Sequence, residues 1–410
     1  MRALSLAALA LLACAPPDGQ PCAELNAELA ACFGEAHESI GCVDVSATDL
    51  RNLRDGLRLL DCAALSASLP LDGDLLAASC RNLGFGCVEA QNPLPPEGAT
   101  RYPLVLVNGI DDSPLFRYSE RILSVLRSRG HAVYLAVDTP YDAPPRRAVG
   151  LWERVKAVKA ESGADKVNLV CHSLGGLDCR YLVSPGGLHW DVGEDLAEIA
   201  GSVASITTIA TAHRGTRIAD VTLGYFTEDE RLDGVTRLAT FLGETFSGRK
   251  LAEDVHLRGA LEALSTVQAA AWNAQTPDEP SIYYQSWAGF SAPRGVSPPG
   301  QTRLLQELCR TDEGDGLAYY HGQYDYLAAP LLPSAEVVGS NNPDYPGENV
   351  PSDGLAPVYS ARWGHFRGCI PADHMEQLGQ QNLPDANVRT GFDIAHFYAQ
   401  VAADLAGRGL

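Results

Sequence analysis

From residue 101 onward, short apolar runs alternate with stretches in which apolar residues recur at helical spacing. The predicted strands are 103–108, 131–137, 166–171 and 202–211. The predicted helices between them are 115–129, 146–162 and a segment that begins near 174. Strands that are apolar on both faces and separated by helices predict a mostly parallel sheet with helices on both sides. Because ligands of such sheets bind beyond the carboxyl ends of the strands, the residues that follow strands are candidates for chemistry.

Residues 14–90 follow a different pattern, with short helical stretches interrupted by cysteines. Six cysteines fall in this part of the chain: Cys22, Cys32, Cys42, Cys62, Cys80 and Cys87. A segment this short has little hydrophobic core of its own, so we predict a small helical module closed by disulfides between these cysteines. The proline-rich segment 91–100 follows and is predicted to be a stiff spacer.

The first residues, MRALSLAALALLAC, place one arginine before an apolar run that is too short to cross a bilayer. This pattern predicts a signal peptide over residues 1–13. Its end resembles a bacterial lipobox, in which the cysteine, here Cys14, becomes the lipidated first residue. The alternative is an ordinary secretory signal in which Cys14 has no role. Both predict export, either as a membrane-anchored lipoprotein of the bacterial cell envelope or as a secreted protein.

Charge and cysteine content narrow the possible partners. The 410 residues carry a formal net charge of −20, which argues against nucleic acid because no basic surplus neutralises phosphates. The chain has 11 cysteines, and lipidation of Cys14 would leave an even number. Their spacings lack the paired CxxC pattern of a zinc site, so we predict disulfides, as expected for an exported protein.

The stretch LVCHSLGG, residues 169–176, joins a predicted strand to a predicted helix. It resembles the G-x-S-x-G pattern of a hydrolase nucleophile, with Cys171 in place of the first glycine. Cysteine is compact and tolerates burial, and Gly175 and Gly176 leave room for the helix to approach the strand. Ser173 is therefore a candidate nucleophile, and it needs a histidine base and a carboxylate partner. The order Ser, Asp or Glu, His is expected in this fold, but seven histidines follow Ser173 and the pattern alone does not choose among them.

Several segments resemble the secreted bacterial triacylglycerol lipases of the Pseudomonas and Burkholderia type. The matching segments are 101–110 (RYPLVLVNGI), 166–181, 212–215 (AHRG), 352–355 (SDGL) and 372–378 (ADHMEQL). At 108–109 this chain has Asn-Gly where that family has His-Gly. The resemblance implies an α/β-hydrolase fold with Ser173 as nucleophile, Asp353 as acid and His374 as base, and Asp325 is the alternative acid. It also implies an oxyanion hole made by the backbone N–H groups of Leu174 and Ile110.

The same resemblance implies a structural calcium ion near the catalytic histidine. Its ligands would be Asp325, Glu376, Gln380 and the backbone carbonyl of Pro384, and the alternative is that Asp325 and Glu376 are solvated surface acids. Oxygen ligands of this kind suit Ca²⁺.

The family also implies a lid, for which residues 216–265 are the candidate. Leu232, Val235, Leu238 and Leu242 fall on one helical face there; the alternative is a helix packed permanently on the core. A bridge between Cys309 and Cys369 would brace the histidine loop, whereas Cys171 and Cys179 could be bonded or be two buried thiols.

The sequence thus predicts an exported α/β-hydrolase with a helical lid and a small disulfide-rich helical module. We expect a carboxylic ester hydrolase, most specifically a triacylglycerol lipase, that acts on lipid esters through an acyl-Ser173 intermediate. An esterase or polyester depolymerase with the same triad is one alternative, and a binding protein on an inactive hydrolase fold is another. A membrane contact would come from the lipid anchor, and any folding helper stays open.

Overall fold

The computed structural model divides the chain into two compact units, residues 1–91 with 381–391 and residues 92–380 with 392–410. The described residues are 23–24, 27, 90–111, 116–136, 139–224, 255–295, 300–311, 324–328, 331–340, 342, 345–379 and 390–410. Cys14 and the six cysteines predicted to close the N-terminal module lie outside them. The fold described below is that of the second unit.

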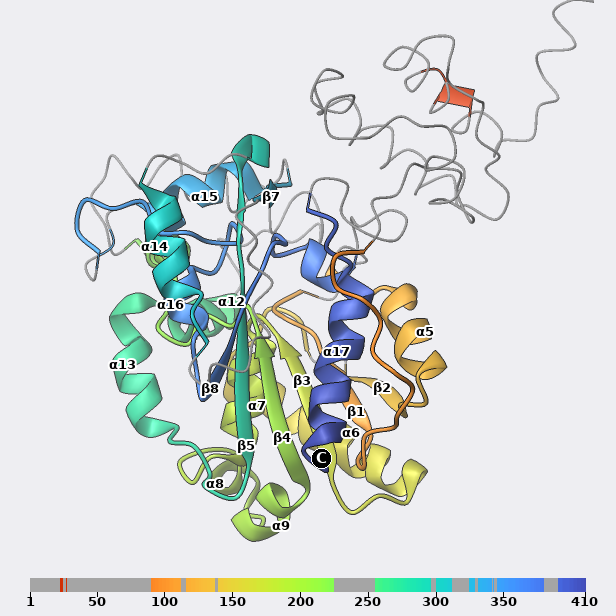
Figure 1. Cartoon of the computed structure of the whole chain (residues 1–410). Helices are drawn as coiled ribbons and strands as arrows, with labels where there is room; N and C mark the ends of the chain where they lie inside the picture. Colours follow the sequence, from red (N-terminus) through yellow and green to blue (C-terminus); the bar gives the residue numbers. More distant parts are fainter. Residues whose placement is uncertain are drawn as a thin grey trace, which may run out of the picture. The chain divides into compact units, whose positions relative to one another are not determined.

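A six-stranded parallel sheet in the order β2-β1-β3-β4-β5-β8 forms the centre of this unit (Figure 1). The strands are β1 (Leu104–Val107), β2 (Val133–Ala136), β3 (Val167–His172), β4 (Val203–Ile209), β5 (Tyr283–Gly289) and β8 (His365–Ile370). The first four are the strands that the apolar runs predicted. The sequence reasoning missed β5 and β8, because polar residues such as Gln285 and Arg367 interrupt their apolar pattern. Both are satisfied internally, since Gln285 donates to the Thr207 hydroxyl and Arg367 pairs with Asp404.

Helices cover both faces of the sheet. The described helices are α5 (Glu120–Ser128), α6 (Pro144–Ser162), α7 (Gly175–Val183), α8 (His189–Val192), α9 (Leu196–Gly201), α10 (Arg217–Leu223), α12 (Val255–Ala263), α13 (Thr266–Gln275), α14 (Gln301–Leu308), α15 (Leu332–Gly339), α16 (Val358–Ala361) and α17 (Ile394–Gly407). Short 3₁₀ turns lie at Pro293–Gly295 and Glu376–Leu378, and β6 (Ser291–Ala292) pairs with β7 (Asp325–Tyr326). Among the helices of the described part, none is both long and apolar enough to cross a membrane.

Strand β1 shows why the sheet is buried on both sides. Leu104 and Leu106 enter one core with α5 and α17, whereas Val105 and Val107 enter a second core with α6 and α7. Successive side chains of a strand point to opposite faces, so a continuous apolar run fits only a sheet covered twice. The α/β-hydrolase architecture predicted from the sequence is confirmed by this layered parallel sheet.

Residues 92–100, which the prolines predicted to be a spacer, pack along this unit. The buried Asn92 side chain donates to the Asp393 carbonyl at 2.9 Å and accepts from the Asp393 N–H at 2.8 Å. Further along, the Gly98 N–H donates to the Arg129 carbonyl and the Thr100 N–H to His131 Nδ1. The segment is therefore held at both ends by hydrogen bonds to the larger unit.

Candidate active site

Ser173 lies in a sharp turn between β3 and α7, at the carboxyl edge of the sheet. Its φ angle is +54°, one of few positive values at non-glycine residues in the described chain. Such a backbone costs about 1–3 kcal/mol and persists only where surrounding contacts hold it. Here the Ser173 N–H donates to the Ile209 carbonyl, and the Ser173 carbonyl accepts from the Thr211 hydroxyl at 2.7 Å and from the Gly176 N–H at 3.0 Å. This turn presents the Ser173 hydroxyl above the sheet.

Both glycines after Ser173 are required by close packing. A Cβ at Gly175 would lie 2.4 Å from the Asn108 carbonyl oxygen, and one at Gly176 would lie 2.0 Å from the Thr211 hydroxyl. Helix α7 therefore approaches β1 and β4 more closely than any side chain allows. Cys171 occupies a fully buried position on the strand side, where a compact side chain fits.

The structure brings Ser173, His374 and Asp353 together from three separate loops. His374 Nε2 lies 2.8 Å from Ser173 Oγ, and His374 Nδ1 lies 2.8 Å from Asp353 Oδ2. A carboxylate beside Nδ1 favours the tautomer that carries its proton there, which leaves Nε2 free to accept the serine proton. The relay of serine, histidine and carboxylate needed to activate a hydroxyl nucleophile is in place.

Asp353 is fully buried and is satisfied by four donors. Its Oδ1 accepts the N–H groups of Leu355 and Ala356 at 3.0 and 2.7 Å. Its Oδ2 accepts His374 Nδ1 and the side-chain amide of Gln377 at 2.9 Å. These bonds fix the plane of the carboxylate beside His374. The carboxylate beside His374 Nδ1 is therefore that of Asp353 and not that of the alternative acid, Asp325.

The backbone N–H groups of Ile110 and Leu174 are the pair that the resemblance implied for an oxyanion hole. Gly109 approaches Ser173 so closely that a Cβ would lie 2.9 Å from the serine Cβ. Within the described part of the chain, the N–H groups of Ile110 and Leu174 donate to no protein acceptor. Ile110 borders the cavity that contains Ser173. The two N–H groups that the resemblance implied are thus available to a bound oxygen.

Arg147 binds the carbonyl end of the peptide that joins Gly109 to Ile110. Its buried guanidinium donates to the Gly109 carbonyl at 2.7 Å and to the Asn108 carbonyl at 3.1 Å. It also forms an ion pair with the buried Asp178 at 2.7 Å. The Gly109 carbonyl and the Ile110 N–H belong to one planar peptide and point in opposite directions. A donor that fixes the carbonyl therefore aims the N–H toward the site, and the sequence reasoning missed this residue.

His172 packs against the His374 imidazole, with its ring centroid 4.6 Å from that of His374. Burial, and then the positive charge that His374 can carry, lower the pKa of His172 well below its usual value. His172 therefore stays neutral and does not compete as a base.

Ser173 and His374 line an apolar cavity that is partly open to solvent. Small and branched apolar side chains make most of its walls: Ile110, Phe116, Ala210, Ala212, Ile218, Ala219, Leu261, Leu264, Leu355 and Ala356. Such walls suit a hydrocarbon chain and give it little to hydrogen-bond.

The two ends of the predicted lid, α10 and α12, pack on the body of the unit. Ile218 and Ala219 of α10 and Leu261 of α12 are buried and form one wall of the cavity. The face of Leu232, Val235, Leu238 and Leu242 lies outside the described residues, so the lid stays a prediction.

Two of the four predicted calcium ligands are described, and both are buried. The Glu376 and Asp325 carboxylates are close neighbours, and Asp373 lies beside them. Burial and the neighbouring carboxylates raise the pKa of Glu376 well above its usual value, and burial raises the pKa of Asp373 to about 7. The Asp373 carboxylate accepts three backbone hydrogen bonds. The N–H groups of residues 375 and 376 donate to Oδ1, and that of residue 328 donates to Oδ2.

Within the described ranges, no three His, Cys, Asp or Glu side chains converge as a metal site. Gln380 and Pro384 lie outside those ranges. A pair of buried carboxylates in contact fits a divalent cation, and it does not fit the alternative of solvated surface acids.

Both cysteine pairs of this unit are disulfides. Cys309, at the end of α14, is bonded to Cys369 of β8, five residues before His374. Cys171 of β3 is bonded to Cys179 of α7, which settles the choice that the sequence left open. Each bridge lies close in sequence to one residue of the triad.

Comparison with known proteins gives no match to any family model. The chain is 35% identical over 216 residues to a triacylglycerol lipase of Pseudarthrobacter phenanthrenivorans, covering 50% of this chain and 61% of that protein. Identity to a triacylglycerol lipase of Burkholderia plantarii is also 35% over 216 residues, covering 50% and 54%. A triacylglycerol lipase of Vibrio cholerae is 29% identical over 239 residues, covering 53% and 72%. The chain thus spans between half and two thirds of the length of the first two relatives.

Among solved structures, a Staphylococcus hyicus lipase is 18% identical with a TM-score of 0.47, covering 77% of this chain and 98% of that one. EstA from Clostridium botulinum is 17% identical with a TM-score of 0.49, covering 79% and 93%. In sequence, the chain is similar to bacterial triacylglycerol lipases over about half of its length.

Proposed function

We propose that this protein is a carboxylic ester hydrolase that acts on lipid esters, most specifically triacylglycerols. The observation that carries the proposal is the unbroken relay from Ser173 Oγ through His374 to Asp353, 2.8 Å at each step, at the base of an apolar cavity. Similarity to triacylglycerol lipases across half of the chain supports the substrate class.

In the proposed reaction, Ser173 Oγ attacks the ester carbonyl carbon while His374 Nε2 takes the hydroxyl proton. The carbonyl oxygen becomes an oxyanion, which the N–H groups of Ile110 and Leu174 stabilise. The carbon–oxygen bond to the alcohol then breaks, and the His374 imidazolium gives its proton to the leaving alkoxide. Water then gives a proton to His374 and attacks the acyl carbon, the bond from that carbon to Ser173 Oγ breaks, and the imidazolium returns the proton to Ser173 Oγ as the acid is released. Asp353 stabilises the imidazolium in both halves of the reaction.

The cavity favours substrates with an apolar acyl group. Its walls offer few hydrogen-bonding side chains besides Ser173 and His374. An acyl chain would gain about 25 cal/mol for each Å² of apolar surface removed from water. We therefore place the acyl chain in this cavity and the alcohol portion toward solvent.

Replacing Ser173 with alanine tests the proposal. Loss of the nucleophile is expected to lower kcat on a soluble p-nitrophenyl ester by about 10⁴-fold or more. A fluorophosphonate probe should label the wild-type chain and leave the variant unlabelled. Ser281→Ala, which removes an exposed hydroxyl, serves as the control and should retain wild-type rates. Hydrolysis by Ser173→Ala within tenfold of wild type would overturn the assignment.

The same assay defines the substrate class when it includes emulsified long-chain triacylglycerol and a polyester film. A lipase is expected to favour the emulsion. Faster turnover of short soluble esters would indicate an esterase, faster turnover of the film a polyester depolymerase, and no turnover of any ester a binding protein on an inactive fold.

We also propose a structural calcium ion held by Asp325 and Glu376, with Gln380 and the Pro384 carbonyl as further ligands. The ion would neutralise buried carboxylates and brace the loop that carries His374. It takes no part in the acyl-transfer steps.

Export is proposed for this chain, with lipidation at Cys14. Two disulfides in the larger unit support an oxidising compartment, because disulfides rarely persist in the cytosol. Mass spectrometry of the N-terminal peptide from envelope fractions measures this directly. A diacylglyceryl-modified Cys14 is expected, and an unmodified N-terminal segment that retains residues 1–13 would contradict the proposal.

A further inference from the structure

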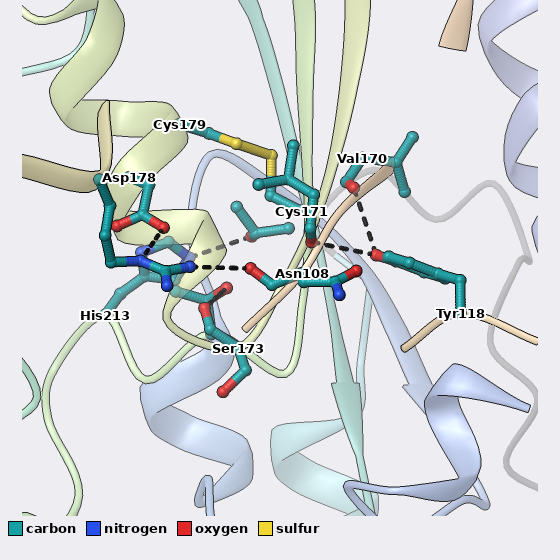
Figure 2. The surroundings of a disulfide bond; sticks show 12 residues. Asn108, Tyr118, Val170, Cys171, Ser173, Asp178, Cys179 and His213 are labelled. Atoms are coloured by element: carbon teal, nitrogen blue, oxygen red, sulfur yellow. Dashed lines mark hydrogen bonds and ion pairs between the residues drawn. A yellow bond between two sulfur atoms is a disulfide. The ribbon is translucent and has the colours of Figure 1, made fainter. Parts of the chain in front are cut away.

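The Cys171–Cys179 disulfide bridges the turn that carries Ser173 (Figure 2). Cys171 lies two residues before Ser173 at the end of β3, and Cys179 lies in α7 six residues after it. Both cysteines are fully buried, and their Cα atoms are 6.7 Å apart. The bridge therefore closes a short covalent ring around the nucleophile.

The backbone inside this ring is under strain. Ser173 keeps a φ of +54° although it has a side chain. The turn is held otherwise by single hydrogen bonds, such as the 2.7 Å bond from the Thr211 hydroxyl to the Ser173 carbonyl. Strained conformations of this kind relax when their surroundings stop determining them. The cross-link limits how far strand and helix can separate.

The residue next to Cys179 extends the effect to the oxyanion hole. Asp178 forms the buried ion pair with Arg147, and Arg147 donates to the Gly109 carbonyl. Figure 2 labels Asp178 next to Cys179, and Asn108. The Arg147 guanidinium donates to the Asp178 carboxylate at 2.7 Å and to the Asn108 carbonyl at 3.1 Å. Because a buried ion pair is costly unless its geometry is kept, movement of α7 would loosen the Ile110 peptide as well.

We infer that the Cys171–Cys179 disulfide is a positioning element for catalysis. It fixes the Ser173 hydroxyl relative to His374 and, through Asp178 and Arg147, fixes the Ile110 N–H relative to both. The inference rests on the proposed function, since it concerns the rate of acyl transfer at the same site.

The test compares the wild-type chain with Cys171→Ala/Cys179→Ala. Misplacement of reacting groups by about 1 Å can lower rates about 100-fold, so kcat on a soluble short-chain ester should fall about 10- to 100-fold while KM changes less than about threefold. The rate of fluorophosphonate labelling should fall in parallel. Loss of folded protein would lower the fraction of chain that the probe labels, whereas misplacement of Ser173 lowers the rate constant of labelling, so kcat is calculated per labelled site.

Leu182→Ala is the matched control, because Leu182 is fully buried in the same helix and the same core but lies outside the ring of residues 171–179. It should lower Tm and leave kcat at 20 °C within about threefold of wild type. If the double alanine variant does not fold, Cys171→Ala/Cys179→Val fills more of the vacated space and carries the same expectation.

Two outcomes would overturn the inference. If the variant without the disulfide keeps kcat and labelling within threefold of a reactive wild type, the disulfide does not position the nucleophile, and the proposed function stands. If fluorophosphonate does not label the wild-type chain, the proposed function fails and this inference fails with it.

Discussion

The two sides of the catalytic centre are stabilised by different means. On the nucleophile side, the buried Asp178 faces the opposite charge of the buried Arg147 at 2.7 Å. On the histidine side, the carboxylates of Asp325, Asp373 and Glu376 lie near one another, and burial first, then the neighbouring carboxylates, raise the pKa values of Asp373 and Glu376. The charges on the nucleophile side are paired with one another, whereas the histidine side gathers carboxyl groups that repel one another when ionised and that a cation would neutralise.

Because of this contrast, the two sides should respond differently when a contact or a bound cation is removed. Loss of a contact on the nucleophile side should move the groups that react, because Ser173 and the Ile110 peptide are held by those contacts directly. Loss of a cation on the histidine side should destabilise a loop first, because the His374–Asp353 pair has its own donors in Leu355, Ala356 and Gln377. We therefore expect large rate effects on one side and mainly stability effects on the other.

The largest effect is expected from removing the guanidinium behind the oxyanion hole. Arg147→Met/Asp178→Leu deletes both charges together, which avoids leaving either one buried alone. The Ile110 peptide then loses the donor that orients it, and loss of one oxyanion donor typically costs about 10²- to 10³-fold in kcat. The measurement is kcat and KM on a soluble ester, with Tm recorded in parallel.

Arg367→Met/Asp404→Leu is the control for that variant, because it removes a mostly buried ion pair between β8 and α17. It should lower Tm while kcat stays within about threefold. Equal kcat values for the two double variants would remove the basis for treating Arg147 as the residue that positions the oxyanion peptide.

Arg147 is also a residue whose position could not be predicted from the sequence. Arg146 and Arg147 are adjacent and look alike in the sequence, yet their side chains are 63% and 1% exposed. Which of the two faces the core depends on how α6 packs on β1, and no local pattern records that. Ser173 could be predicted because strand, turn and helix are neighbours along the chain.

The pairing of cysteines could not be predicted from the sequence either. Cys171 and Cys179 lie eight residues apart on a strand and a helix, and only the distance between their Cα atoms decides whether they bond. Strands β5 and β8 were missed for a related reason, since the polar side chains of Gln285 and Arg367 find partners far away in sequence.

A smaller effect on rate, with a clear effect on stability, is expected from removing calcium. A ligand at about 100 times its Kd stabilises the folded chain by about 2.7 kcal/mol, and for domains of about 150–250 residues each kcal/mol shifts Tm by about 2–4 °C. EDTA should therefore lower Tm by about 5–10 °C, and excess Ca²⁺ should restore it while Mg²⁺ does not. At 20 °C, fluorophosphonate labelling of Ser173 should change less than threefold, because the nucleophile side needs no cation.

Glu376→Gln should abolish the Tm response to EDTA, whereas Glu307→Gln, on the exposed face of α14, should retain it. If EDTA leaves Tm unchanged in a chain that holds no bound metal, the buried carboxylates are stabilised by protonation. A missing cation would then not explain the difference between the two sides.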